Sequence, residues 1–163
     1  MTDKLQNNIN YLVEELNFKG SKKFKLIVVF GLLGDFDSFE YAINLKNFID
    51  NNNLHGRVKL LGYKSEPYNF IKNCDIFILT SKFEGLPNVL LEAQFFKKYI
   101  ISSDCPTGPR EILLNGKAGD LFRIGDYKRL AKYINNYHLN QKKIIKKINF
   151  GYSKFNRFDY DLN

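Results

Sequence analysis

Short runs of apolar residues alternate along the chain with segments of helical periodicity, and this alternation restricts the fold more than any other feature. The runs expected to form strands lie at 24–31, 57–63, 75–81, 99–104 and 120–125. Apolar residues recur at helical spacing over 37–53, 66–74, 87–97, 109–119, 126–138 and 140–149. The pattern predicts an α/β fold, a Rossmann-like doubly wound parallel sheet with helices on both faces.

The two ends of the chain are less regular. Residues 3–16 predict an opening helix where a doubly wound domain ordinarily begins with a strand, so we expect the first strand of the sheet to be missing. A chain of 163 residues suggests one domain, placed at 1–150, followed by an aromatic and polar tail at 151–163. No leader is visible and no apolar run approaches the roughly 20 residues of a spanning helix, so we expect a cytoplasmic protein.

The net charge of +8 makes an anionic partner plausible. The densest basic run is "QKKIIKKI" at 141–148, in which a helix would group Ile144, Ile145 and Ile148 away from the lysines. A solvated helix face is the simplest interpretation of this run. Peripheral contact with the inner face of a membrane is the alternative, and no nucleic-acid partner is expected.

Cysteines and histidines do not cluster in the sequence as they do in metal sites. Cys74 and Cys105 have neither metal-ligand spacing nor the density of a disulfide scaffold, so both are expected to be free thiols. His55 and His138 have no Cys or His neighbours. Two Asp-x-Asp pairs, Asp35/Asp37 and Asp159/Asp161, have a spacing that can chelate a divalent ion, but surface turns explain both more simply. We therefore expect no metal site.

Ligands of such sheets bind beyond the carboxyl ends of the strands, which here means residues 31–37, 62–66, 80–88 and 102–110. A helix predicted to begin near Pro87 would present unpaired amides, Asn88 and Val89 among them, that attract phosphate. Glu84 and Glu92 are good acceptors for the hydroxyls of a sugar or ribose. A sugar nucleotide uses both features, although both glutamates could equally be ordinary surface residues.

The stretch "NCDIFILTSKFEGLPNVLLEA" at 73–93 resembles the carboxyl-terminal, donor-binding half of retaining GT-B glycosyltransferases of family four. These bacterial enzymes build capsules, lipopolysaccharides and glycans. Glu84 and Glu92 match the Glu-x7-Glu signature of the family, and the resemblance covers roughly residues 20–135.

The resemblance implies a role for each matching residue. Glu84 would be catalytic, close to the hydroxyls and reacting face of the transferred sugar, and Glu92 would bind the ribose. The turn at 31–34 and the amides around 85–89 would hold the diphosphate, and the backbone at 62–63 would hold the base. The loop at 108–110 would also bind the donor, although a proline turn capped by Thr107 would explain that loop as well. Besides Glu92, the residues implied to bind the donor are Gly31, Gly34, Gly62, Tyr63, Gly85, Leu86, Asn88, Val89, Gly108 and Arg110.

The implied activity is that of a hexosyl- or N-acetylhexosaminyl-transferase that retains anomeric configuration and requires no cofactor or metal. Its donor would be a nucleotide-sugar, with UDP favoured, and its acceptor a sugar or lipid-linked sugar. Family members carry a second Rossmann-like domain for the acceptor, which 163 residues cannot also contain. We therefore expect a fragment that needs an acceptor-domain polypeptide.

One motif of the family is not matched. The Gly-Arg…Lys loop that neutralises the diphosphate leaving group has only a poor counterpart at Lys4, which would remove an electrostatic contribution to catalysis. An inactive nucleotide-sugar-binding relic is therefore one alternative. A different nucleotide-binding module is another, although the chain has neither a G-x-G-x-x-G nor a P-loop.

Overall fold

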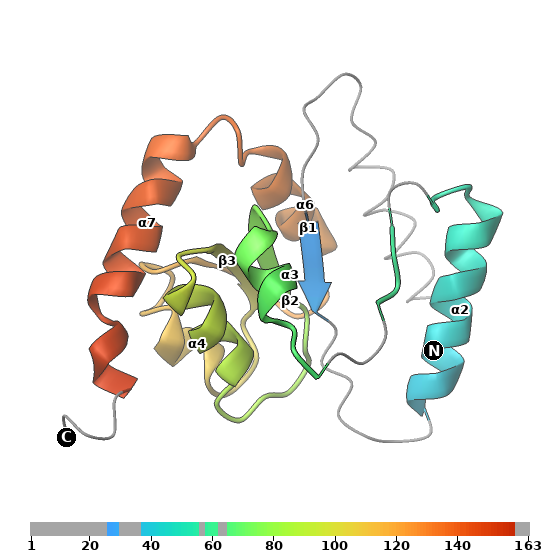
Figure 1. Ribbon diagram of the computed structural model, residues 1–163, viewed down its shortest axis with the longest axis horizontal. Coiled ribbons are helices and arrows are strands. Elements are labelled where there is room, and N and C mark those ends of the chain that lie inside the picture. The colour runs from blue at the N-terminus through green and yellow to red at the C-terminus, as the bar shows by residue number, and fades with distance from the viewer. Residues whose placement is uncertain (1–25, 30–36, 56–57, 62–64, 159–163) are drawn as a thin grey trace. The chain divides into compact units, whose positions relative to one another are not determined.

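Figure 1 presents the computed structural model of the chain, which describes residues 26–29, 37–55, 58–61 and 65–158. The chain divides into two compact units, one formed by Gly31–Pro67 and the other by Met1–Phe30 with Tyr68–Asn163. The predicted opening helix at 3–16 lies outside the described residues.

The larger unit contains a four-stranded parallel sheet whose strands lie side by side in sequence order. These strands are β1 (Leu26–Val29), β2 (Ile76–Leu79), β3 (Tyr99–Ser103) and β4 (Asp120–Phe122). In the central pair, Ile76 is opposite Tyr99 and Leu79 is opposite Ser102. The parallel sheet predicted from the sequence is therefore confirmed, with β4 at an edge.

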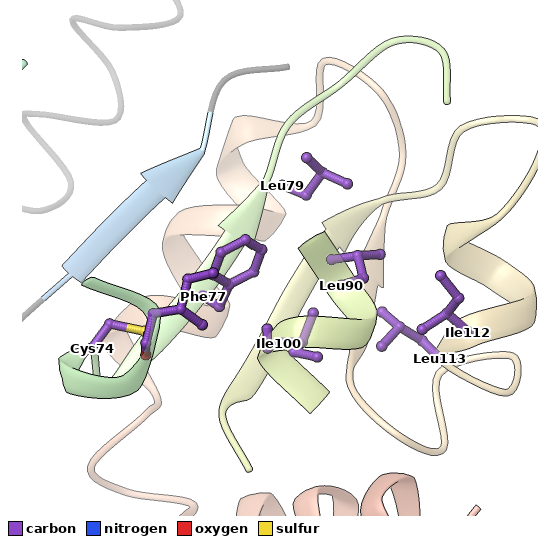
Figure 2. Close-up of a cluster of buried hydrophobic side chains, with 9 residues drawn as sticks. Cys74, Phe77, Leu79, Leu90, Ile100, Ile112 and Leu113 are labelled. Atoms are coloured by element: carbon purple, nitrogen blue, oxygen red, sulfur yellow. The ribbon is translucent and has the colours of Figure 1, made fainter. Parts of the chain in front are cut away.

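Helices cover both faces of this sheet. The helices of the larger unit are α3 (Tyr68–Asn73), α4 (Asn88–Phe95), α5 (Pro109–Ile112), α6 (Tyr127–Asn135), α7 (Gln141–Ser153) and the 3-10 helix η1 (Phe155–Phe158). One core cluster packs Phe77, Leu79 and Ile100 against α3, α4 and α5 (Figure 2). The second packs Ile78 and Ile101 against α6 and α7.

The two middle strands are apolar on both faces because helices bury both. Every residue of β2 and β3 is buried, and alternate residues of β2 belong to different clusters. This explains why "IFIL" reads as a continuous apolar run rather than as an alternating one.

The smaller unit contains α2 (Asp37–Asn51), which confirms the predicted helix at 37–53. The strand predicted at 57–63 is not formed in its described part, 58–61. Val58 N–H instead donates to Leu54 O at 2.8 Å, and Leu60 is exposed. Apolar, β-branched composition gives a strand only where another strand offers ladder hydrogen bonds, and residues 58–61 pair with none of the described strands.

Helix α5 is shorter than the sequence predicts. It ends at Ile112, and Leu114, Asn115 and Gly116 then adopt positive φ angles of 51°, 55° and 85°. Three successive left-handed residues cannot continue a right-handed helix. The chain returns to the sheet at Gly119, where a Cβ atom would lie 2.7 Å from Ile100 O.

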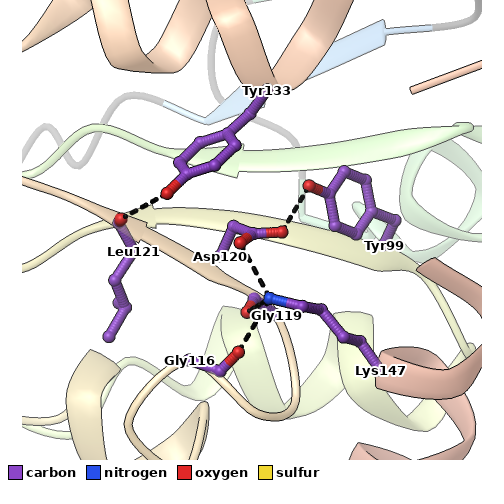
Figure 3. A network of polar contacts seen from close by, with 7 residues as sticks. All are labelled: Tyr99, Gly116, Gly119, Asp120, Leu121, Tyr133 and Lys147. Carbon is purple, nitrogen blue, oxygen red and sulfur yellow. Dashed lines mark hydrogen bonds and ion pairs between the residues drawn. The ribbon is translucent and has the colours of Figure 1, made fainter. Parts of the chain in front are cut away.

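A partly buried lysine holds this return turn (Figure 3). Lys147 Nζ donates to Gly116 O at 2.8 Å, Gly119 O at 2.9 Å and Asp120 Oδ1 at 2.8 Å. Tyr99 donates to the other oxygen of Asp120 at 2.6 Å. Burial, and then this carboxylate, raise the pKa of the Tyr99 hydroxyl. Lys147 is therefore an internal residue and not part of the solvated face expected for 141–148.

Replacing Lys147 by Met should lower the free energy of unfolding by about 3 kcal/mol, because the substitution leaves the Asp120 charge and two carbonyls without their donor. Urea unfolding followed by circular dichroism measures this difference. Lys146→Met on the exposed side of the same helix is the matched control and should change stability by less than about 0.5 kcal/mol. Equal unfolding midpoints for the two variants would contradict the structural role of Lys147.

Candidate functional site

The loops that follow β2 and β3 are bonded to each other at the carboxyl edge of the sheet. Ser103 Oγ donates to Ser81 O at 2.6 Å, and Thr107 Oγ1 donates to Glu84 O. The parallel register of the two strands brings the loops to the same edge. Two of the four segments predicted to carry chemistry, 80–88 and 102–110, therefore lie together.

Gly108 allows the closest approach between these loops. Its φ angle is +81°, and a Cβ atom there would lie within 3.0 Å of both Gly85 O and Pro87 Cδ. Only glycine combines this backbone conformation with the missing side chain. Gly85 itself is exposed, with open space where its Cβ would be.

Helix α4 begins at this edge without a side-chain cap. Its N-cap residue is Pro87, whose side chain offers no acceptor, while Pro87 O accepts from Leu90 N–H at 2.9 Å. Asn88 is exposed at the first position. The start of the helix therefore keeps amides and the positive end of its dipole available to an anion.

Glu92 lies one helical turn after Asn88 on the same side of α4. It is half-buried, and in the part of the chain that the structure describes its carboxylate has no hydrogen-bond or ion-pair partner. Burial raises the pKa of Glu92 above its ordinary value. A carboxylate that is desolvated without a partner is a good acceptor for a ligand hydroxyl.

Glu84 is half-buried in the loop before α4. Its backbone oxygen accepts a hydrogen bond from the Thr107 hydroxyl. Burial, and then the charge of Glu84, raise the pKa of Cys105. Cys105 is thus a neutral, buried thiol. Cys74 and Cys105 are both free, as predicted.

Arg110 is paired within the site. Its Nε donates to Asp104 Oδ1 at 3.0 Å, and its Nη2 bonds to the other oxygen of the same carboxylate. Asp104 N–H in turn donates to Phe122 O at 2.7 Å. Arg110 is exposed but oriented by a carboxylate that offsets its charge.

The structure describes only some of the predicted residues. Those it brings to this edge, on the loops after β2 and β3, on α4 and on α5, are Glu84, Gly85, Leu86, Asn88, Val89, Glu92, Gly108 and Arg110. Gly31, Gly34, Gly62 and Tyr63 lie outside the described residues, so their roles stay predictions.

Sequence reasoning gave Thr107 a wrong role and missed other residues. The N-cap of α5 is Gly108, without a side-chain cap, and the Thr107 hydroxyl bonds across to the Glu84 loop instead. Ser103 and Asp104 could have been noticed as polar residues ending a strand. The 79% exposure of Phe83, beside Glu84, could not be inferred from the residue itself.

No three His, Cys, Asp or Glu side chains in the described ranges are grouped so that they could hold a metal ion. Among the described helices, none combines the length and apolar character that crossing a membrane requires.

The family described as "Glycosyl transferases group 1" matches residues 6–153. The lipopolysaccharide 1,6-galactosyltransferase of Salmonella typhimurium is 32% identical over an alignment of 137 residues, which covers 76% of this chain and 37% of that protein. An uncharacterised glycosyltransferase of Methanocaldococcus jannaschii is 43% identical over 82 residues, 50% of this chain and 20% of that protein. The chain thus spans well under half the length of these relatives.

Solved structures share the fold. Anabaena HepE in complex with UDP has a TM-score of 0.73 at 22% identity, over 91% of this chain and 40% of that chain. The C-terminal domain of the group 1 glycosyl transferase LpcC from Francisella tularensis has a TM-score of 0.62 at 19% identity, over 77% of this chain and 65% of that chain. These likenesses establish the architecture as one half of a GT-B structure.

Gly108→Ala should destabilise the chain by about 2 kcal/mol more than Gly125→Ala, as measured by urea unfolding. Both glycines have a φ of +81°, but only the alanine at 108 would collide with the 84–87 turn, since Gly125 has open space around it. The difference between the variants therefore isolates the contact between the loops. Equal losses would show that the two loops do not depend on this approach.

Glu92→Gln should make the ligand-free chain more stable at pH 7 and leave its stability unchanged near pH 3. The folded-state pKa of Glu92 is raised, so folding favours the protonated form. The free-energy cost of keeping Glu92 ionised in the folded chain is absent below its unfolded-state pKa of about 4.3. This cost grows as the pH rises through the raised folded-state pKa. Thermal melting of both proteins from pH 3 to 7 tests this, and a Gln variant less stable than the parent at pH 7 would contradict it.

Proposed function

Because the chain belongs to the group 1 glycosyl transferases and has the fold of the carboxyl-terminal half of a GT-B enzyme, we propose that it binds the nucleotide-sugar donor of a sugar transfer. The transfer would be a step in the synthesis of a lipopolysaccharide, capsule or related glycan. The names of relatives support this, among them a capsular polysaccharide biosynthesis glycosyltransferase of Staphylococcus aureus.

The observation that carries the proposal is the edge where the 84–87 turn meets α4. An uncapped helix start suits the diphosphate, and the unpartnered Glu92 carboxylate one turn later suits the ribose hydroxyls. Thr107 and Gly108 fix this turn from the neighbouring loop. Such prior ordering matters because a ligand then spends little free energy on organising its site.

Glu84 is the carboxylate proposed to act at the transferred sugar. In the transfer, a bond forms between the anomeric carbon and an acceptor oxygen, and the bond from that carbon to the diphosphate breaks. The diphosphate leaves with the electron pair of that bond and takes up the proton that the acceptor hydroxyl loses. Glu84 lies in the loop that leads into α4, before the proposed diphosphate-binding amides. The chemistry proposed for it is hydrogen bonding to the sugar hydroxyls near the reacting face, with retention of configuration and no metal ion.

The proposed donor is a UDP-linked hexose or N-acetylhexosamine. Structures of Anabaena HepE contain UDP and UDP-glucose, and the named relatives include galactosyl- and N-acetylgalactosaminyl-transferases. The proposed acceptor is a sugar or lipid-linked sugar at the cytoplasmic face of a membrane. An acceptor-binding half, in the same or another polypeptide, would complete the active cleft.

An inactive relic that binds the donor is the alternative, and the pairing of Arg110 favours it. The bidentate contact with Asp104 offsets a positive charge that a departing diphosphate could otherwise use. Binding and turnover are therefore tested separately.

Thermal melting of the chain with UDP, UDP-glucose, GDP, ADP and NAD tests donor binding. At 100 times its dissociation constant a ligand adds about 2.7 kcal/mol, which should raise the melting temperature by roughly 5–10 °C. We expect UDP to give this shift and Glu92→Gln to abolish it. The control Glu111→Gln removes an exposed carboxylate on α5 and should keep the shift.

Glu84→Gln separates the two glutamates in the same assay. This variant should keep the shift with UDP and lose the additional shift that UDP-glucose gives over UDP. If no nucleotide changes the melting of a cooperatively folding chain, the donor-site proposal is wrong. If UDP binds but no sugar is transferred when an acceptor domain is supplied, the relic interpretation holds.

A further inference from the structure

The carboxyl-terminal part of the chain has a strongly one-sided charge. Residues 127–158 contain nine Lys and Arg and no Asp or Glu, so this segment alone carries more positive charge than the net +8 of the whole chain. The nine are Lys128, Arg129, Lys132, Lys142, Lys143, Lys146, Lys147, Lys154 and Arg157. A concentration of one sign on one segment indicates an anionic partner.

One side of helix α7 packs against the core, although Ile145, which was expected on that side, is 49% exposed. Ile144 and Gly151 are buried, Ile148 packs against the core, and Lys147 is held by three oxygens. Gly151 lies so close to α4 that a Cβ there would be 2.6 Å from Gln94 Nε2. These contacts fix which side of the helix points away from the sheet.

The outward side combines lysines with large apolar side chains. Lys142, Lys146 and Phe150 follow one another at steps of four residues, and Lys143 lies beside them. All three lysines are exposed, Phe150 is 37% exposed, and Leu139, just before the helix, is 80% exposed. We call these five residues the α7 outer face.

We propose that the α7 outer face binds the surface of a phospholipid bilayer that contains anionic headgroups. Lysines beside aliphatic and aromatic side chains suit the boundary between headgroups and acyl chains, where the charge stays with phosphate and the apolar part enters. A nucleic acid would use the lysines but not the exposed Leu139, which is why the lipid surface is favoured. The proposal does not depend on the donor site.

The α7 outer face is short, so we expect its affinity for a membrane surface to be modest. Thirteen residues of helix extend over about 20 Å, and only three of the four lysines in the 141–148 run are available, because Lys147 is internal. Each exposed lysine near an anionic surface should contribute about fivefold to binding. Removing all three should therefore weaken vesicle binding on the order of a hundredfold.

Cosedimentation with vesicles of equal phosphatidylglycerol and phosphatidylcholine, compared with phosphatidylcholine alone, tests the proposal. The variant K142Q/K143Q/K146Q should bind the anionic vesicles about a hundredfold more weakly than the parent chain. The variant K46Q/K72Q/K117Q removes the same charge from exposed sites elsewhere and should lose far less affinity. L139N should weaken binding even in 0.5 M salt, since its contribution is apolar. Unchanged melting temperatures would show that all variants fold.

Three results would overturn the proposal. The first is equal vesicle binding by the parent chain and the α7 variant, and the second is an equal loss in both triple variants, which would make net charge alone responsible. The third is binding of duplex DNA through the same lysines by a chain that does not bind anionic vesicles. A loss confined to K142Q/K143Q/K146Q supports it, whatever the outcome of the nucleotide assay.

Discussion

The parallel pairing of β2 with β3, buried on both faces, is the constraint on which the rest of the larger unit depends. Its register places Leu79 opposite Ser102. Both strands therefore end at the same edge of the sheet, and the loops that follow them begin there. Helices bury both faces, and apolar burial of this kind is the dominant favourable contribution to folding. The loops can be polar and exposed because they take little part in that core.

The candidate site at this edge has three features that would be expected where ligand binding competes with stability. A helix start without a cap, a desolvated carboxylate without a partner and a glycine with positive φ are each mildly unfavourable for folding. Their cost to stability is offset by contacts between the two loops, such as the hydrogen bond from the Thr107 hydroxyl to Glu84 O. A ligand with a diphosphate and sugar hydroxyls would satisfy the first two features at once.

The lysines of α7 illustrate how one residue type serves two purposes. Lys147 is part of the internal structure, since its ammonium ion joins the return turn after α5 to Asp120 at the start of β4. Lys146, its immediate neighbour, is exposed. One step of about 100° around a helix separates an internal ion pair from a surface charge.

Much of the architecture was predictable from the sequence. Strands such as "IFIL" are apolar enough, and the helices periodic enough, that local pattern and tertiary packing favour the same structure. The segment 58–61 is the exception, since its composition favours a strand but strand formation requires a partner. The length of α5 was also missed, because the left-handed residues Leu114 and Asn115 end the helix early. Lys147, which is distant in the sequence, bonds to Gly116 O directly after them.

The sequence by itself determined the order of the elements, the parallel sheet and the two glutamates at the Glu-x7-Glu spacing, because these depend on period and spacing along the chain. Only the tertiary structure decided that Thr107 holds the Glu84 loop, that Arg110 is paired with Asp104 and that Lys147 is internal. Each of these is a contact between residues whose meeting depends on how strands and loops pack. Spacing along the chain predicts the type of an element, whereas hydrogen bonds between elements depend on positions that only the packed core fixes.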